Sequence, residues 1–312
     1  ALISGYAKHG YGNAALICLE KMEEEGFSPN AITYVCSLKA CASIGALDKG
    51  KEIHMNIEKD GLVQQNIVVG NALIDMYAKC GSLAKAAEVF HVMPVRNIVT
   101  WSTIVAGYAQ HGFGEEALHY LEQMKLEGIT PDAVTYISSL KACASAGAIF
   151  KGQQIHAEII TKRLLGTNLA VGNTLIDMYG SCGLLIEAQD VFDEMPVRNI
   201  ISWNILIAGY AEHGDAKGTT KCLKEMELEG VSPNATTRIC SLKACANTEA
   251  INKGMEIHSE IIRSDSLKCD IILATALVEM YVKFNMLVKA EQVLDELPVG
   301  DAIIWNVLIA GY

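Results

Sequence analysis

Nearly the same sequence segment occurs three times in the chain, and this repetition constrains the fold more than any other feature. The segment SLKACA occupies residues 37–42 and returns unchanged at 139–144 and 241–246, a spacing of 102 residues. The run NALIDMYAKCG at 71–81 returns as NTLIDMYGSCG at 173–183 and more loosely as TALVEMYVKFN at 275–285. A fixed period of this kind is typical of proteins that stack one small structural unit many times.

Each block of 102 residues divides into units of 35, 36 and 31 residues, for example 98–132, 133–168 and 169–199. Two apolar stripes at helical spacing lie in the first of these units. They consist of Trp101, Ile104, Val105 and Tyr108, and of Ala117, Leu118, Leu121 and Met124. Every unit is therefore predicted to contain two helices.

Glycine and proline residues separate the predicted helices. Gly112 and Gly114 bracket a turn between the two stripes, and Gly128 with Pro131 ends the second helix. The 31-residue units end at Met-Pro or Leu-Pro, which shortens their second helix; these prolines are Pro94, Pro196 and Pro298. Since no hairpin of this size can bury both stripes alone, neighbouring hairpins must stack. We predict an all-α solenoid, a right-handed superhelix whose inner surface is lined by the first helix of every unit.

Charge and hydropathy narrow the classes of partner. The formal net charge of −11 argues against a simple polyanion binder, because nonspecific affinity for nucleic acid comes mainly from Lys and Arg. No stretch reaches the roughly 18 to 20 apolar residues of a membrane-spanning helix, so no membrane partner is expected. Residues 1–6 match internal text at 103–108 and 205–210. We therefore expect a fragment of a longer array, with any transit peptide outside it.

The ten cysteines follow the repeat instead of forming a metal or disulfide pattern. Cys41, Cys143 and Cys245 share one slot, whereas Cys80 and Cys182 share another that holds Phe284 in the third copy. A zinc ligand could not become Phe without loss of the site, but a small buried residue could. We interpret these cysteines as packing residues in a reducing compartment, and we expect no metal and no cofactor.

The unit lengths and their text together resemble the pentatricopeptide repeat (PPR) family of plants, in the PLS subclass that alternates P, L and S repeats. The P text is NIVTWSTIVAGYAQHG with ALHYLEQMKLEGITPD, and the L text is AVTYISSLKACASAGAIFKGQQIHAEII. The S text runs from Leu169 to Asn199 and ends in EMPVRN. Tetratricopeptide repeats share the hairpin, but their Trp-Leu-Gly-Tyr signature does not occur here.

The resemblance covers the whole chain and divides it into ten segments. They are a partial P repeat at 1–30, L at 31–66, S at 67–97, P at 98–132, L at 133–168, S at 169–199, P at 200–234, L at 235–270, S at 271–301 and the start of a P repeat at 302–312. The resemblance implies binding of single-stranded RNA in mitochondria or chloroplasts, with one base per repeat read by its fifth and last residues. It also implies that apolar second residues of adjacent repeats clamp each base.

Carried onto this sequence, the resemblance gives five complete pairs of base-reading candidates. They are Asn71 with Asn97, Ser102 with Asp132, Asn173 with Asn199, Asn204 with Asn234, and Thr275 with Asp301. A hydroxyl with a carboxylate suits guanine, whose Watson–Crick edge offers N–H donors. Two Asn amides can turn either way and should accept pyrimidines without separating cytosine from uracil. The pairs of Asn30 and Asn306 are incomplete.

The stacking candidates occupy the second position of their repeats. They are Val68, Val99, Ile201 and Ile272, while Ala170 is too small to clamp a base well. The L repeats carry Val35, Ile137 and Ile239 at the fifth position, and an apolar side chain cannot hydrogen-bond a base edge, so they are treated as spacers. With the chain parallel to the RNA, the expected footprint is 5′-N-Y-G-N-Y-Y-N-G-3′ from repeat 31–66 onward.

Structural roles compete with these assignments. Asn or Asp before a helix is a common N-cap, which would account for every last-position residue. The second-position Val and Ile side chains could equally belong to the core. Asn71, Asn173 and Asn204 fall inside the first helix, where Asn is a mediocre helix former, and this favours a functional role for them.

Two histidine motifs imitate a catalytic site. His156-Ala-Glu158 and His258-Ser-Glu260 resemble the His-x-Glu of zinc nucleobase deaminases, but no Pro-Cys-x-x-Cys follows. His54 in the same slot is followed by Met and Asn, so these histidines belong to the L helix. His9, His111 and His213 share a slot at the inter-helix turn, where a surface or packing role is expected. We expect no catalytic residue and no enzyme activity in this chain.

The leading expectation is recognition of organellar transcripts as part of a C-to-U RNA editing factor. The editing step would need a C-terminal extension or partner proteins of an editing complex. Two alternatives stay open: stabilisation or splicing of organellar RNA by the same array, and a protein-binding helical scaffold, which the acidic charge also suits.

Overall fold

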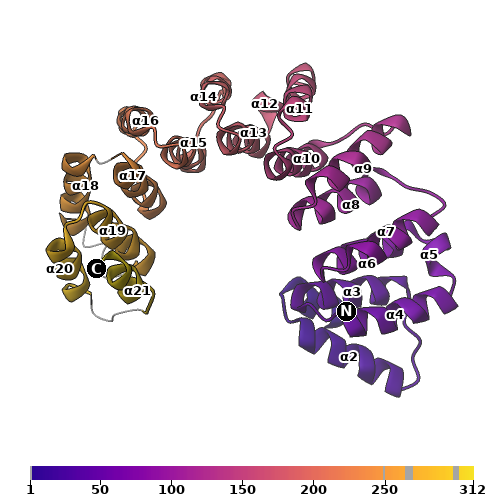
Figure 1. The fold of residues 1–312 in the computed structure, drawn as a ribbon. Helices are drawn as coiled ribbons and strands as arrows, with labels where there is room; N and C mark the ends of the chain where they lie inside the picture. Colours follow the sequence, from indigo (N-terminus) through magenta and orange to yellow (C-terminus); the bar gives the residue numbers. More distant parts are fainter. Residues whose placement is uncertain (1, 249, 264–269, 298–301) are drawn as a thin grey trace. The chain divides into compact units, whose positions relative to one another are not determined.

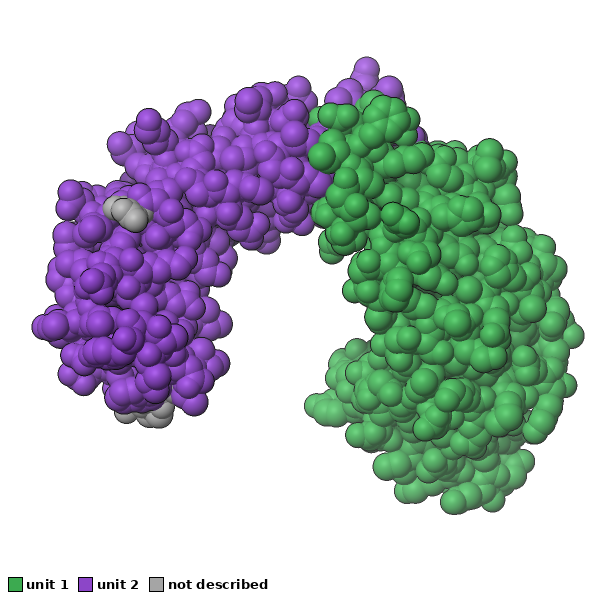
Figure 2. All heavy atoms as spheres, viewed as in Figure 1, with its two compact units in different colours: residues 1–157 green, residues 158–312 purple. Residues whose placement is uncertain are grey.

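The computed structural model describes residues 2–248, 250–263, 270–297 and 302–312. Every regular element in these ranges is a helix, so the predicted all-α class is confirmed (Figure 1). The chain divides into two compact units, residues 1–157 and 158–312 (Figure 2), and each is described by itself.

Unit 1 contains five hairpins or parts of hairpins. Its helices are α1 (Leu2–Lys8), α2 (Gly12–Glu24), α3 (Ala31–Ile44), α4 (Leu47–Lys59), α5 (Leu62–Gln65), α6 (Ile67–Lys79), α7 (Leu83–Val92), α8 (Ile98–Gln110), α9 (Gly114–Leu126) and α10 (Ala133–Ala146). Helix α11 (Ile149–Thr161) contains the boundary between the two units.

Unit 2 repeats the arrangement. Its helices are α12 (Leu164–Thr167), α13 (Leu169–Ser181), α14 (Leu185–Glu194), α15 (Ile200–Glu212), α16 (Ala216–Leu228), α17 (Ala235–Asn247), α18 (Ile251–Arg263), α19 (Ile271–Lys283), α20 (Leu287–Asp295) and α21 (Ala302–Gly311).

Within each unit the first helices of successive hairpins pack side by side. In unit 1, α3 contacts α6, α6 contacts α8, and α8 contacts α10. In unit 2 the same succession runs through α13, α15, α17, α19 and α21. We call these helices the first-helix layer of each unit; the second helices pack against them as a separate layer (Figure 1). This is the stacked solenoid that the repeat predicts.

The predicted apolar stripes form the core. Trp101, Ile104 and Val105 of α8 are buried, as are all four members of the second stripe in α9. The Trp101 ring lies edge-on to Phe90 with the centroids 4.7 Å apart, and Trp203 repeats the contact with Phe192 at 4.5 Å. Such edge-to-face aromatic pairs add to the stability that burial provides.

Turns and helix ends also follow the sequence. Gly112 and Gly128 adopt φ of +78° and +75°, a left-handed conformation that glycine takes without steric cost. The second helices α7 and α14 of the 31-residue units have 10 residues, against 13 in α9 and α16. Pro298 lies outside the described residues.

Two features differ from the sequence analysis. One-turn helices, α5 and α12, follow the second helix of two L units, because the extra residues wind into a turn that in α5 buries Val63. Cys80 and Cys182 are only partly buried and end α6 and α13 as C-caps, so their interpretation as buried residues was wrong. Cys41, Cys143 and Cys245 are buried, as expected of packing residues.

No helix in the described ranges is long and apolar enough to cross a membrane.

Candidate nucleic-acid interface

In four of the complete P and S repeats the last residue caps the helix that follows it. Asn97, Asp132, Asn199 and Asn234 precede α8, α10, α15 and α17, and each accepts a hydrogen bond through Oδ1 from the backbone N–H of the third helical residue. The N···O distances lie between 2.8 and 3.0 Å. Helix capping, the structural role that competes with base reading at these residues, is therefore present at all four positions.

Capping does not account for the choice between Asn and Asp. Either residue caps through Oδ1, and the two types are about equally good caps. They differ in the second terminal group, which is an NH2 donor in Asn97 and a carboxylate oxygen in Asp132. That second group, a donor in Asn and an acceptor in Asp, can distinguish between ligands.

In four P and S repeats the fifth residue lies one turn into the first helix and is joined to the next repeat by a hydroxyl. Thr100 Oγ1 lies 2.7 Å from Asn71 Oδ1, and Ser202 Oγ lies 2.7 Å from Asn173 Oδ1. Thr237 Oγ1 lies 2.5 Å from Asn204 Oδ1. In the fourth case two hydroxyls meet, Ser102 Oγ and Thr135 Oγ1, at 2.7 Å.

The same hydroxyls also reach the last residue of the pair. Thr100, Thr135, Ser202 and Thr237 are each the third residue of a repeat, and each lies 2.7 to 3.2 Å from Oδ1 of the capping residue. Direct contacts add to this: Asn204 Nδ2 donates to Asn234 Oδ1 at 3.2 Å. Four of the five sequence-predicted pairs are thus brought together. Asp301 of the fifth pair lies outside the described residues.

Sequence reasoning missed these four hydroxyls. A signal was available, because a Ser or Thr follows three residues after each capping Asn or Asp, as in a capping box. The connection to the fifth residue of the preceding repeat depends on how two helices stack, and one sequence does not display that distance.

The ends of the L repeats are built differently. Asn66, Asn168 and Asp270 cap α6, α13 and α19 through Oδ1. The third residue that follows is apolar and buried at all three places, namely Val69, Val171 and Leu273. The fifth residues of these repeats, Val35, Ile137 and Ile239, are apolar as well. The polar network is therefore specific to the P and S repeats.

The second-position side chains are exposed. Val68, Val99, Ile201 and Ile272 each leave more than half of their surface open to solvent. The alternative that they are core residues was wrong for all four. Ala170 is exposed too, and three side chains that share this position but were not singled out are likewise exposed, namely Ile32, Val134 and Ile303.

A pocket lies beside a complete pair in unit 1. Val99 and Val134 flank Ser102 and Asp132 in a pocket of about 330 Å³, which Lys79 also lines. The two apolar side chains come from adjacent repeats, α8 and α10, and the polar pair lies with them. This arrangement offers two apolar faces and a polar edge, which is what a flat heteroaromatic ring needs.

Unit 2 has a comparable pocket near its last described pair member. Ile272 and Ile303 flank Thr275 in about 240 Å³, together with Lys243. Thr275 Oγ1 donates to the backbone carbonyl of Ile271 at 2.7 Å.

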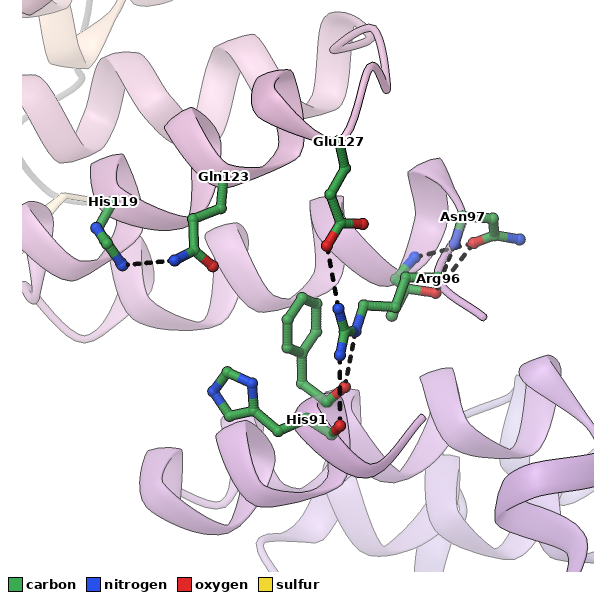
Figure 3. A network of polar contacts seen from close by, with 8 residues as sticks. His91, Arg96, Asn97, His119, Gln123 and Glu127 are labelled. Carbon is green, nitrogen blue, oxygen red and sulfur yellow. Dashed lines mark hydrogen bonds and ion pairs between the residues drawn. The ribbon is translucent and has the colours of Figure 1, made fainter. Parts of the chain in front are cut away.

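An arginine holds the segment before the capping residue in two S repeats, and Figure 3 shows the first of them, Arg96. Arg96 donates to the carbonyl oxygen of Phe90 at 3.0 Å and contacts Glu127 at 3.2 Å. Its guanidinium carbon lies 4.7 Å from the centre of the Phe90 ring. Arg198 contacts Glu229 at 2.9 Å and lies 5.0 Å from the centre of the Phe192 ring, but its Nε donates to the carbonyl oxygen of Met195 at 3.4 Å. The arginine of the shared MPVRN segment therefore holds the backbone from which Asn97 and Asn199 project.

The comparisons with known proteins agree with this geometry. A model described as "PPR repeat family" matches residues 1–43, 96–145 and 198–247, and one described as "PPR repeat" matches 71–98 and 173–200. Together the two models cover more than half of the chain. The chain belongs to the pentatricopeptide repeat family.

Curated relatives of this PPR chain come from Arabidopsis thaliana. A chloroplastic pentatricopeptide repeat-containing protein is 36% identical over 312 residues, all of this chain and 50% of its own length. A mitochondrial one is 32% identical over 311 residues, all of this chain and 30% of its own length. The chain spans about half the length, or less, of these relatives.

A solved structure shares the fold. The pentatricopeptide repeat protein PPR10 of maize, in complex with an 18-nucleotide psaJ RNA element, aligns with a TM-score of 0.71 and 19% identity. The alignment covers 99% of this chain and 52% of PPR10. At this identity the likeness concerns the fold.

Charges of both signs line the first-helix layer of the PPR repeats. In unit 2 a pocket of about 260 Å³ is lined by Glu212 and Glu279 as well as Lys243 and Lys283. In unit 1 Lys79 is paired with Asp75 at 2.9 Å. Because the lysines are balanced by carboxylates, the surface is not a simple basic patch, and selective contacts must supply much of any affinity for RNA.

Two of the histidines that share the L-repeat slot, His54 and the deaminase-like His258, make helix-packing contacts. His54 Nδ1 lies 2.8 Å from the Tyr77 hydroxyl, and His258 Nδ1 lies 2.7 Å from that of Tyr281. Burial lowers the pKa of both imidazoles below the ordinary value of 6.5. Each pair joins the second helix of an L repeat to the first helix of the next S repeat. His111 and His213 end α8 and α15 as C-caps.

Proposed function

We propose that this PPR chain binds single-stranded RNA in a sequence-specific manner, with one base per repeat. The observation that carries the proposal is the recurring pair of fifth and last side chains, joined at four repeat boundaries and accompanied by exposed apolar second residues. Exposed Val or Ile side chains recur at the second position of successive repeats, and the faces of a base are suited to apolar stacking against them. The RNA named in the PPR10 complex supports this class of ligand.

The chemistry of the pairs gives the proposed sequence. Ser102 with Asp132, and Thr275 with Asp301, present a hydroxyl and a carboxylate that can accept the N–H donors of guanine. The three Asn–Asn pairs accept pyrimidines, and the L repeats contribute no selection. From repeat 31–66 onward the proposed footprint is 5′-N-Y-G-N-Y-Y-N-G-3′.

The proposed setting is an organelle, because the relatives are named chloroplastic and mitochondrial. The proposed role is recognition of a transcript for C-to-U editing, with the deaminating activity supplied by a further domain or by partner proteins. Support of RNA stability or splicing by the same array is a second candidate. Protein binding is a third, and the net charge of −11 favours it over a nonspecific RNA role.

A binding assay with matched oligonucleotides tests the proposal. Fluorescence anisotropy with the RNA 5′-AUGAUUAG-3′ between unstructured flanks should give a saturable curve. A control RNA, 5′-AACAAAAC-3′ in the same flanks, changes only the five selected bases and should bind at least about tenfold more weakly, because each lost base contact costs about 1 kcal/mol. Equal binding to both RNAs, or binding to neither, would contradict the proposed code.

A further inference from the structure

The third-position hydroxyls are buried between two side chains that the proposed function assigns to base reading. Thr100, Thr135, Ser202 and Thr237 have little or no exposed surface. Each sits at a boundary where the preceding repeat has a polar fifth residue. At the L boundaries both the third residue that follows and the fifth residue are apolar. The hydroxyl therefore accompanies a polar fifth residue at these four boundaries, whereas the buried Ile304 occupies the third position after the polar fifth residue Thr275.

Capping alone does not require this hydroxyl. Asn66, Asn168 and Asp270 cap their helices through backbone N–H groups, with Val or Leu at the third position. The cap at Asn97 likewise uses the backbone N–H of Thr100, at 3.0 Å. The Thr100 hydroxyl is an addition to the cap and needs a separate explanation.

The proton of the hydroxyl fixes the orientation of the neighbouring amide. A hydroxyl has one proton to donate, and Thr100 Oγ1 already accepts from the backbone N–H of Asn97 at 3.2 Å. Of its two possible acceptors, Asn71 Oδ1 is closer, at 2.7 Å against 3.1 Å for Asn97 Oδ1. A distance of 2.7 Å is typical of O–H···O and short for N–H···O, so the oxygen of Asn71 faces the hydroxyl.

The opposite end of the amide, its NH2 group, then faces away from the hydroxyl, and in Asn204 one of its two N–H groups donates to Asn234 Oδ1 at 3.2 Å while the other stays available. Ser202 holds Asn173 in the same way at 2.7 Å, and Thr237 holds Asn204 at 2.5 Å. Thr135 instead lies 2.7 Å from both Ser102 Oγ and Asp132 Oδ1, and so joins the hydroxyl and the carboxylate of the guanine pair.

We propose that Thr100, Thr135, Ser202 and Thr237 are specificity-determining positioning residues, each of which orients the fifth side chain of the preceding repeat toward its base. The unit that reads one base is then three side chains from two repeats. An Asn held by such a hydroxyl offers a donor only, so it selects a base edge with an acceptor at that point. This inference rests on the proposed RNA binding.

Thr100 offers the sharpest test, because its effect is confined to the second base of the footprint. Thr100→Val keeps the shape and the backbone cap but removes the proton donor. Thr100→Ser restores the hydroxyl, as Ser202 does naturally. Thr33→Val is the matched control: Thr33 bonds to the cap Asn30 at 3.0 and 3.1 Å, and its boundary lies before the repeat 31–66, with which the proposed footprint begins.

Selectivity is measured as the ratio of dissociation constants for RNAs with a pyrimidine or a purine at one base. Thr100→Val should lower this ratio about fivefold at the second base, as expected for one hydrogen bond, and leave it unchanged at the fifth and sixth. Thr100→Ser and Thr33→Val should retain it. Thermal unfolding of each variant identifies any general loss of structure.

Two results would overturn the inference while leaving the proposed function intact. One is a Thr100→Val chain that keeps its selectivity at the second base. The other is an equal loss of affinity for every RNA together with a lower unfolding temperature, since this marks a purely structural residue. If the unmodified chain shows no selectivity for any base, the proposed function itself fails, and the inference fails with it.

Discussion

Single residues at the repeat boundaries cap helices and, in the function that we propose, also read bases. Asp132 caps α10 through Oδ1 and also lies 3.5 Å from Ser102 Oγ. Its cap explains why an Asn or Asp occurs there, and its second oxygen is the part that differs from Asn. A substitution at this position that keeps the cap can therefore separate an effect on stability from an effect on the proposed base recognition.

Asp132→Asn makes that separation. The free energy of unfolding should change by less than about 0.5 kcal/mol, because Asn and Asp are comparable N-caps. The preference for guanine at the third base should be lost, because the substitution replaces an acceptor by an NH2 donor. Urea denaturation and anisotropy titrations check the two parts. An unchanged guanine preference would assign Asp132 to capping alone.

The buried histidines give a pH-dependent contribution to stability. Burial places the pKa values of His54 and His258 below 6.5 in the folded chain. As the pH falls below 6.5, the unfolded chain binds protons that the folded chain does not, so the free energy of unfolding decreases.

A comparison with His54→Gln/His258→Gln isolates this contribution, because glutamine does not titrate. The stability of the unmodified chain relative to this variant should be lower at pH 5.5 than at pH 7.5, by urea denaturation. The same difference at both pH values would show that the two imidazoles take up protons equally in the folded and unfolded chains.

At the scale of helices, close packing at the start of the second helix limits which residues are allowed. A Cβ atom on Gly114 would lie 2.5 Å from the carbonyl oxygen of Ala142 and 2.9 Å from the Cβ of Ala146. Backbone of α10 cannot move aside cheaply, so α9 can begin beside it only with glycine at this position.

Gly114→Ala should therefore destabilise the chain by about 1 to 3 kcal/mol, the usual cost of overpacking. Gly5→Ala is the control, since a Cβ there has no neighbour within 4 Å. It should be neutral or slightly stabilising, because alanine favours helix over glycine. Chemical denaturation measures both, and equal effects would contradict the close approach of α9 and α10.

Helices could be predicted from sequence where apolar periodicity was strong. The stripe around Trp101 was predicted correctly because its apolar spacing reflects burial. The shortened helix before Pro94 was predicted correctly because the proline ends it. The helix α5 was missed because four residues carry no periodic pattern. The bond from Thr100 to Asn71 was missed because it depends on stacking of two repeats, and its register is a tertiary property.

For the whole molecule, the acidic charge sets the kind of RNA binding that is possible. The net charge is −11, and Lys79 of the first-helix layer is paired with Asp75. Few phosphate groups of a bound RNA can then be neutralised by the lysines of this surface. A plot of the logarithm of the association constant against that of salt concentration should have a slope no steeper than about −2, given about −0.7 per phosphate contact. A slope steeper than about −4 would indicate binding dominated by phosphates.

The pair at the last S repeat tests the central claim that fifth and last residues choose the base. Replacing Thr275 and Asp301 together by Asn converts the proposed guanine pair into the Asn–Asn pair found at 71 and 97. Dissociation constants are measured for RNAs that differ only at the eighth base. We expect a change of preference from guanine to pyrimidine at that base and at no other, whereas an unchanged preference would contradict base selection by the fifth and last residues.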